Sequence, residues 1–180
     1  MTFARVRALV VVSALAVLAV AFVVYALVDD SQKGRTLAAQ CPAGWPVVDL
    51  TLKKAEDIKI NVFNATDTPG RAESVGSDFA NRKFQVLKKG NSKTAVDGVA
   101  TLRYGPKAVA GAHVIRAYFL DEAKIEYDPA RTDDVVDVVI GDQFKQLATT
   151  TEVNQSLVEV GEPTLPPGAC TKPPAAAKDE

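Results

Sequence analysis

The first limit on how this chain can fold is an uncharged stretch of 21 residues, Ala8–Val28. At 1.5 Å per helical residue the stretch spans about 30 Å, which is the thickness of the hydrocarbon core of a bilayer. Two arginines precede it and two aspartates follow it. Because basic flanks stay in the cytoplasm, the pattern predicts a single-pass plasma-membrane anchor over residues 8–28, with residues 1–7 cytoplasmic and the rest of the chain outside.

A cleaved signal peptide is the alternative interpretation of this stretch. Ala19, Val20 and Ala21 offer the small-x-small pattern of a cleavage site. The apolar region of a signal peptide is about 7–15 residues long, so the observed length favours an uncleaved anchor. Under both interpretations the residues that follow the stretch are extracytoplasmic.

The charge and residue counts exclude several classes of function. The chain has 180 residues, with 21 basic and 22 acidic side chains, and this balance excludes a polycation that binds nucleic acid. One histidine and two cysteines do not supply the ligand sets of a zinc site. We therefore expect no nucleic-acid partner, no metal and no cofactor.

The two cysteines, Cys41 and Cys170, lie on either side of nearly all of the exported chain. An oxidising compartment allows them one intramolecular pairing, so we predict a Cys41–Cys170 disulfide. Two free thiols and intermolecular bridges are the alternatives that the sequence leaves open.

Composition divides the exported part into three segments. Residues 29–46 form a polar stalk and a turn-rich lead-in that contains the first cysteine, and residues 47–160 form the predicted domain. Residues 161–180 hold half of the ten prolines together with an alanine run, which is typical of an extended tail.

The hydrophobic pattern of the domain switches repeatedly between the strand and the helix period. Residues 135–140 are so apolar that we expect them to form the central strand of the sheet, covered on both faces. The predicted order is β-α-β-β-α-β-β, which indicates an α/β (α+β) sandwich with two helices packed on a mixed sheet. A further edge strand is predicted within residues 149–160. The other expected elements are strands at 58–63, 84–88, 99–104 and 124–127 and helices at 71–82 and 105–120.

The sequence offers no arrangement of residues that supports catalysis. It has no nucleophile elbow, no phosphate-binding loop and no HExxH motif, so we expect a protein that is not an enzyme. The single histidine, His113, is predicted to be a solvated helix residue. Asp133, Asp134 and Asp137 superficially resemble an acidic metal motif, but a turn followed by a charged strand residue is the favoured interpretation.

One group of residues suggests a ligand site. Both predicted helices begin directly after strands, so their N-termini are expected to lie at the same edge of the sheet, where they attract anions or polar ligand groups. Helix capping and surface solvation are the alternative explanation for these residues. The candidate ligand-binding residues are Asn64, Thr66, Arg71, Tyr104 and Lys107.

Two segments of the domain resemble a known family. Ile60–Thr66, followed by Gly70 and Ala72, resembles the opening V-x-V-x-N-G-T-x-x-x-G-x-A of the LytR C-terminal domain family. Val138–Phe144 is similar to the closing V-V-L-G-x-D-F strand of that family. The resemblance covers residues 57–147, with Ala65 where the family has glycine, and that departure puts a ligand role for the loop in doubt.

The resemblance has implications for function. In that family the domain occurs behind a LytR-CpsA-Psr phosphotransferase domain or alone on a membrane anchor, and this chain is similar to the stand-alone, actinobacterial kind. The resemblance implies a role in maintaining the cell envelope, with LytR-CpsA-Psr phosphotransferases or cell-wall polymer as partners. It implies no reaction.

Overall fold

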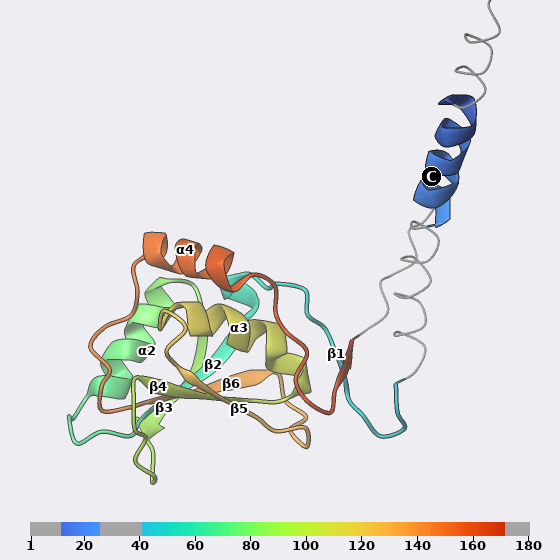
Figure 1. Cartoon of the computed structure of the whole chain (residues 1–180). Helices are drawn as coiled ribbons and strands as arrows, with labels where there is room; N and C mark the ends of the chain where they lie inside the picture. Colours follow the sequence, from blue (N-terminus) through green and yellow to red (C-terminus); the bar gives the residue numbers. More distant parts are fainter. Residues whose placement is uncertain (1–11, 26–40, 172–180) are drawn as a thin grey trace, which may run out of the picture. The chain divides into compact units, whose positions relative to one another are not determined.

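The computed structural model describes residues 12–25 and 41–171, which belong to two separate units. Residues 12–25 are helical (Figure 1). Among the described residues, no helix combines the length and the apolar character needed to cross a membrane. The predicted anchor continues at both ends beyond residues 12–25, into positions that lie outside the described residues. The same holds for residues 1–7, 29–40 and 172–180.

The larger unit is a mixed α+β domain, as the sequence predicts. Two short 3₁₀ turns, Ala55–Asp57 and Pro106–Ala108, precede β2 and α3. The strands are β1 (Val47–Val48), β2 (Lys59–Asn64), β3 (Gln85–Asn91), β4 (Ala100–Tyr104), β5 (Lys124–Tyr127), β6 (Val135–Ile140) and β7 (Cys170–Thr171), and the α-helices are α2 (Arg71–Asn81), α3 (Val109–Ala117) and α4 (Thr150–Val160).

Five of the strands form the main sheet, in the order β3-β2-β6-β4-β5. The apolar strand β6 is central, as predicted for residues 135–140. The expectation that it is covered on both faces is wrong, because the helices lie on one face of the sheet (Figure 1). Strand β6 pairs in parallel with β2 and antiparallel with β4. The direction of β4 follows from its connection, because the chain passes from β3 to β4 without a crossover helix and therefore turns back.

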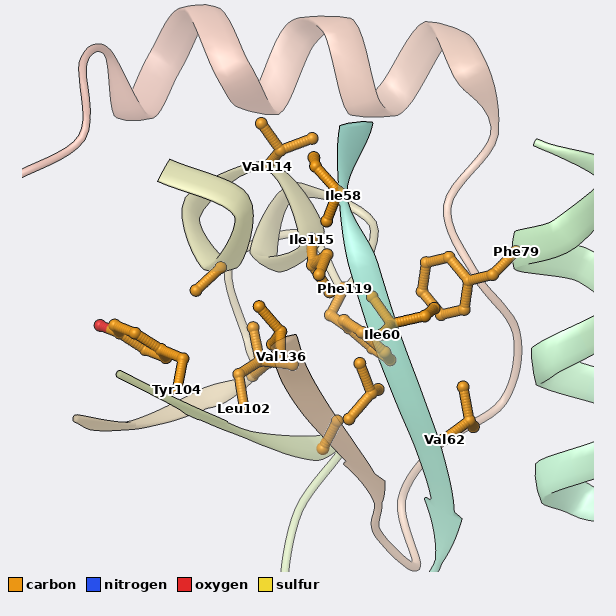
Figure 2. Close-up of a cluster of buried hydrophobic side chains, with 14 of the residues drawn as sticks. Ile58, Ile60, Val62, Phe79, Leu102, Tyr104, Val114, Ile115, Phe119 and Val136 are labelled. Atoms are coloured by element: carbon orange, nitrogen blue, oxygen red, sulfur yellow. The ribbon is translucent and has the colours of Figure 1, made fainter. Parts of the chain in front are cut away.

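The core lies between the sheet and the helices α2 and α3, which cover one face of it (Figure 1). Alternate residues of each strand point into this layer, so that Ile60, Leu102 and Val136 are fully buried (Figure 2). Phe79 of α2 and Ile115 of α3 extend the core into the helix layer, and both are 0% exposed. The two predicted helices are thus confirmed as the cover of the sheet.

Residues 150–160 form the helix α4, so the edge strand predicted within residues 149–160 is wrong. Thr149 and Glu152 form a capping box, in which the Glu152 carboxylate accepts from the Thr149 amide at 2.7 Å. This reciprocal cap fixes the start of a helix. The helix packs on α3 through Val153, which is 4% exposed, and so adds a third layer above the helix pair.

Loss of this cap is expected to destabilise the domain. Thr149→Ala removes the hydroxyl that accepts from the Glu152 amide, and we expect it to lower the free energy of unfolding by about 1 kcal/mol in urea denaturation. The control is Thr150→Ala, because Thr150 is also exposed but is not the cap residue. Equal effects of the two variants would contradict the capping role.

The chain after α4 does not leave the domain at residue 161. Pro163, Pro166 and Ala169 are buried, and β7 pairs in parallel with β1. Residues 161–171 of the predicted tail are therefore part of the packed structure. Cys170 lies in β7 and is disulfide-bonded, as is Cys41, and no described cysteine is free. The predicted Cys41–Cys170 disulfide is confirmed.

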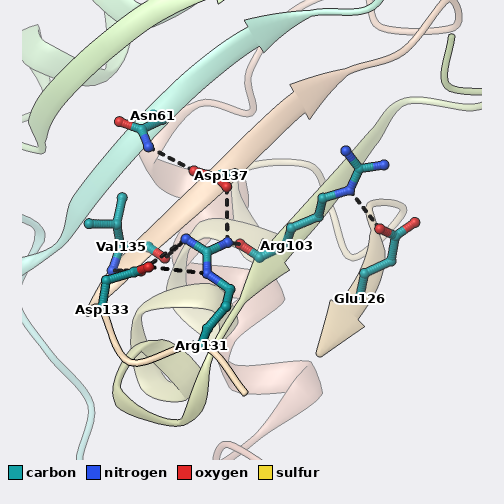
Figure 3. A network of polar contacts seen from close by, with 7 residues as sticks. All are labelled: Asn61, Arg103, Glu126, Arg131, Asp133, Val135 and Asp137. Atoms are coloured by element: carbon teal, nitrogen blue, oxygen red, sulfur yellow. Dashed lines mark hydrogen bonds and ion pairs between the residues drawn. The ribbon is translucent and has the colours of Figure 1, made fainter. Parts of the chain in front are cut away.

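The sheet face opposite the helices carries a network of charged side chains (Figure 3). Arg131 lies at its centre and donates to Asp137 at 2.9 Å and to Asp133 at 2.9 Å. Asn61 donates to the second Asp137 oxygen at 2.7 Å, and Lys59 pairs with Asp134 at 2.9 Å. The three aspartates that resemble a metal motif are therefore ion-pair partners, and Asp137 is the charged strand residue that the sequence predicts.

Acid is expected to weaken the domain through this network. Burial opposes the ionisation of Asp133, but hydrogen bonds from Arg131 and the Val135 amide outweigh it and hold the pKa below its ordinary value of 3.8. A hydrogen bond from Lys59 likewise lowers the pKa of Asp134. The stabilisation is therefore complete above about pH 4 and is lost as the pH falls through the folded-state pKa values.

Urea denaturation between about pH 5 and about pH 2.5 tests this. We expect the free energy of unfolding to fall more steeply with acid for the original chain than for Asp133→Asn, because the variant has no carboxylate to protonate at that position. Parallel curves for the two proteins would exclude Asp133 as a source of acid sensitivity.

Candidate functional site

The predicted ligand site is divided between the two ends of the sheet. Asn64, Thr66 and Arg71 lie at the carboxyl end of β2, where α2 begins, whereas Tyr104 and Lys107 lie at the carboxyl end of β4. Because β4 runs antiparallel to β6 and β2 runs parallel to it, these two ends are opposite. The expectation that both helix starts share one edge is therefore wrong.

The residues after β2 shape the turn into α2. Asn64 is 4% exposed, its amide donates to the Thr68 carbonyl at 2.8 Å, and its oxygen accepts from the Thr66 amide at 3.0 Å. These bonds use much of the hydrogen-bonding capacity of the Asn64 side chain. Ala65 has no positive φ, so the alanine at the family's glycine position fits this turn without strain.

Tyr104 and Lys107 have different environments at the other end. Tyr104 is 5% exposed, its ring centroid lies 5.8 Å from that of Tyr127, and burial raises the pKa of its phenol. Lys107 is exposed. Tyr104 lines a cavity of about 470 Å³ together with Ile125 and the chain segment 164–167.

Arg71 has a structural role that the sequence does not show directly. Its guanidinium donates to the Phe144 carbonyl at 2.7 Å and lies 5.9 Å from the centroid of the Phe144 ring. Arg82, which follows α2, repeats this arrangement, because it donates to the Ala148 carbonyl at 2.6 Å and lies 5.3 Å from the Tyr118 ring centroid. The two arginines together hold both ends of residues 144–148, in the loop between β6 and α4.

A cavity of about 620 Å³ opens beside this loop. It lies between residues 142–148 and the end of α3, and its lining includes Phe119 and Phe144, which are 3% and 8% exposed. Around these rings stand exposed polar side chains, among them Glu122 and Gln146. We call this space the loop cavity.

Sequence reasoning missed the loop cavity and Arg82, but one signal for Arg82 was present. Arg71 and Arg82 are 11 residues apart, which at 100° per residue places them about 20° apart on one face of a helix, three turns from each other. Their spacing indicates a common neighbour along that face. Nothing in the sequence indicates that this neighbour is the loop after β6.

The domain is a small mixed sheet with helices on one face, and two arginines hold the loop that follows its central strand. Residues 57–144 match the family described as LytR cell envelope-related transcriptional attenuator, LytR_C. The chain carries a LytR_C domain over these residues. The resemblance that the sequence shows over residues 57–147 is therefore confirmed.

A solved structure supports the same fold. The soluble domain of a conserved hypothetical secreted protein from Mycobacterium marinum aligns with a TM-score of 0.50 and 22% identity, over 61% of this chain and 72% of that one. At this identity the likeness establishes the fold alone. No curated protein sequence matches the chain significantly.

Proposed function

We propose that this chain is a non-enzymatic, membrane-tethered module of the cell envelope that docks envelope-building enzymes or wall polymer outside the plasma membrane. The disulfide between Cys41 and Cys170 carries the proposal, because such bonds persist in oxidising compartments outside the cytoplasm. The match of residues 57–144 to the LytR_C family, and a structural neighbour described as secreted, agree with this location.

The proposed tether is the uncharged segment 8–28, of which residues 12–25 are helical. It would cross the plasma membrane once, with the N-terminus in the cytoplasm and the domain outside. This order of anchor, cysteine, domain and second cysteine is similar to that of the actinobacterial envelope integrity protein Cei. LytR-CpsA-Psr phosphotransferases and cell-wall polymer are the proposed partners.

The environment of the single histidine supports a role without catalysis. Nε2 of His113 lies 2.9 Å from the Gly161 carbonyl oxygen, so this ring nitrogen faces the end of α4 rather than a nucleophile. A general base must lie within hydrogen-bond reach of the proton that it removes. His113 is thus better placed to join α3 to the chain after α4.

In-cell crosslinking followed by mass spectrometry tests the docking role. We expect the full chain to capture envelope-building enzymes or wall fragments. A matched control carries residues 1–40 fused to an unrelated disulfide-bonded domain, so that it shares the proposed tether and lacks the LytR_C domain. Equal recovery of envelope material by both proteins would contradict the proposal.

A second candidate function is binding of peptidoglycan or an attached wall glycan, and the loop cavity favours it. The residues of the helix-start site predicted for this role are divided. Arg71 contacts the loop beside the cavity, whereas Lys107 lies at the opposite end of the sheet. We expect Arg71→Ala to reduce sedimentation of the chain with purified sacculi and Lys107→Ala to leave it unchanged. Unchanged sedimentation of both variants would remove the helix-start residues from consideration.

A further inference from the structure

We propose that the loop cavity is a binding site for an uncharged sugar, one or two pyranose rings in length. The proposal rests on the second candidate function above and names both its site and its ligand class. The cavity volume of about 620 Å³ lies within the range of about 300–1,000 Å³ that is typical of small-molecule sites.

The floor of the cavity is apolar and partly aromatic. Phe119, Phe144 and Leu147 are at most 8% exposed, and Tyr118 beside them is half-buried. The ring carbons of a pyranose present a flat face of C–H groups, which packs on such side chains. The floor therefore offers a packing surface for one face of a pyranose ring.

The rim offers groups that suit sugar hydroxyls. Glu122, Gln143 and Gln146 are exposed, and within the described part of the chain their side chains have no hydrogen-bond partner. A carboxylate accepts hydrogen bonds, and an amide both donates and accepts them. A hydroxyl group of a sugar can match either kind of partner, so a ligand with several hydroxyl groups can use the whole rim.

The charges around the cavity select against an anion. Three carboxylates line it, those of Glu122, Asp142 and Glu152, and Lys145 is the single cation among the lining side chains. The guanidinium groups of Arg71 and Arg82 lie beside the Phe144 and Tyr118 rings but do not line the cavity, and both donate to loop carbonyls. Asp142 accepts from the Gly98 amide at 3.0 Å and Glu152 accepts at the cap of α4, so both carboxylates are held in place by these bonds. A phosphate or uronate would meet like charges at short range, whereas an uncharged sugar would not.

The cavity wall is held in position before any ligand enters. Arg71 and Arg82 bind the carbonyls at the two ends of residues 144–148, and their guanidinium groups lie near the rings of Phe144 and Tyr118. A wall fixed in this way loses little freedom when a ligand binds, which favours affinity.

Isothermal titration calorimetry of the full chain tests the proposal, in a detergent without a sugar head group. Diacetylchitobiose serves as the probe for the amino sugars of peptidoglycan, β-1,4-galactobiose as the probe for an attached neutral polymer, and digalacturonate as the anionic counterpart. We expect one of the two uncharged disaccharides to bind and digalacturonate not to bind. Tighter binding of diacetylchitobiose would identify peptidoglycan as the source of the ligand, and tighter binding of β-1,4-galactobiose would identify an attached neutral polymer.

Rim variants locate the binding at this cavity. Gln146→Ala removes two hydrogen-bonding groups and is expected to weaken binding of the preferred disaccharide by about five- to tenfold. Gln155→Ala on the exposed face of α4 is the matched control and is expected to leave the affinity unchanged.

Three results would overturn the proposal: no binding of either uncharged disaccharide, equal binding of digalacturonate, or an unchanged affinity for Gln146→Ala. These results are separate from the in-cell test of docking. A chain that binds the disaccharide in calorimetry and captures no envelope material in cells supports the sugar site and contradicts the docking role.

Discussion

Replacing Cys41 and Cys170 by serine together is expected to lower the free energy of unfolding by about 4–5 kcal/mol. The disulfide closes a loop of about 130 residues, and the loop-entropy model assigns a larger stabilisation to a longer loop. The strands that the bond supports are short, since β1 and β7 pair over two residues each. A loss of this size is a large share of the stability of a domain, which is typically about 5–15 kcal/mol.

Two measurements check this expectation. Urea denaturation of the full chain in detergent gives the free energy of unfolding for the original protein and for the double serine variant. Thiol labelling of the folded original protein should modify no cysteine before reduction and two cysteines after it. Labelling of both thiols in the absence of a reductant, together with equal stability of the two proteins, would falsify the intramolecular bond.

The main elements of the domain could be predicted from the sequence because each carries a strong local signal. Residues 135–140 are apolar at every position except Asp137, and such a run is typical of the central strand of a sheet. Residues 71–81 place Ala72, Val75 and Phe79 at helical spacing, and all three are buried.

The helix α4 was missed because its apolar face is narrow. Val153 and Ser156 are the buried residues of this 11-residue helix. Its hydrophobic pattern is therefore weak at both the helix period and the strand period. The stronger signal was the cap, a threonine followed three residues later by a glutamate at Thr149 and Glu152. Local capping chemistry was thus more informative here than hydrophobic periodicity.

The candidate site could not be predicted because it depends on strand direction. Periodicity identifies β4 as a strand, but the direction of β4 depends on the path of residues 92–99, which connect it to β3. A crossover helix there would have placed Tyr104 at the same end as Arg71. In the structure the residues at the end of α3 meet the loop after β6, where the Phe119 ring lies 5.9 Å from that of Phe144, and the loop cavity forms there.

Phe79→Ala is expected to lower the free energy of unfolding by about 3–5 kcal/mol, the range for removing a fully buried aromatic ring. Phe79 is 0% exposed and lies near Phe119 in the core (Figure 2). Its ring centroid is 5.2 Å from that of Phe84, 5.7 Å from that of Tyr118 and 6.3 Å from that of Phe119. Urea denaturation measures the loss. The matched control is Phe63→Ala, because Phe63 is half-buried on the uncovered sheet face and should cost about 1 kcal/mol.

The same pair of variants connects the core to the proposed sugar site. Tyr118 and Phe119 line the loop cavity and also pack against Phe79, so the space left by Phe79→Ala lies directly behind the cavity floor. We expect this variant to weaken binding of the preferred disaccharide under conditions in which it is still folded, and Phe63→Ala to leave that binding unchanged. Equal affinities for the two variants would show that the floor of the cavity does not depend on the aromatic core beneath it.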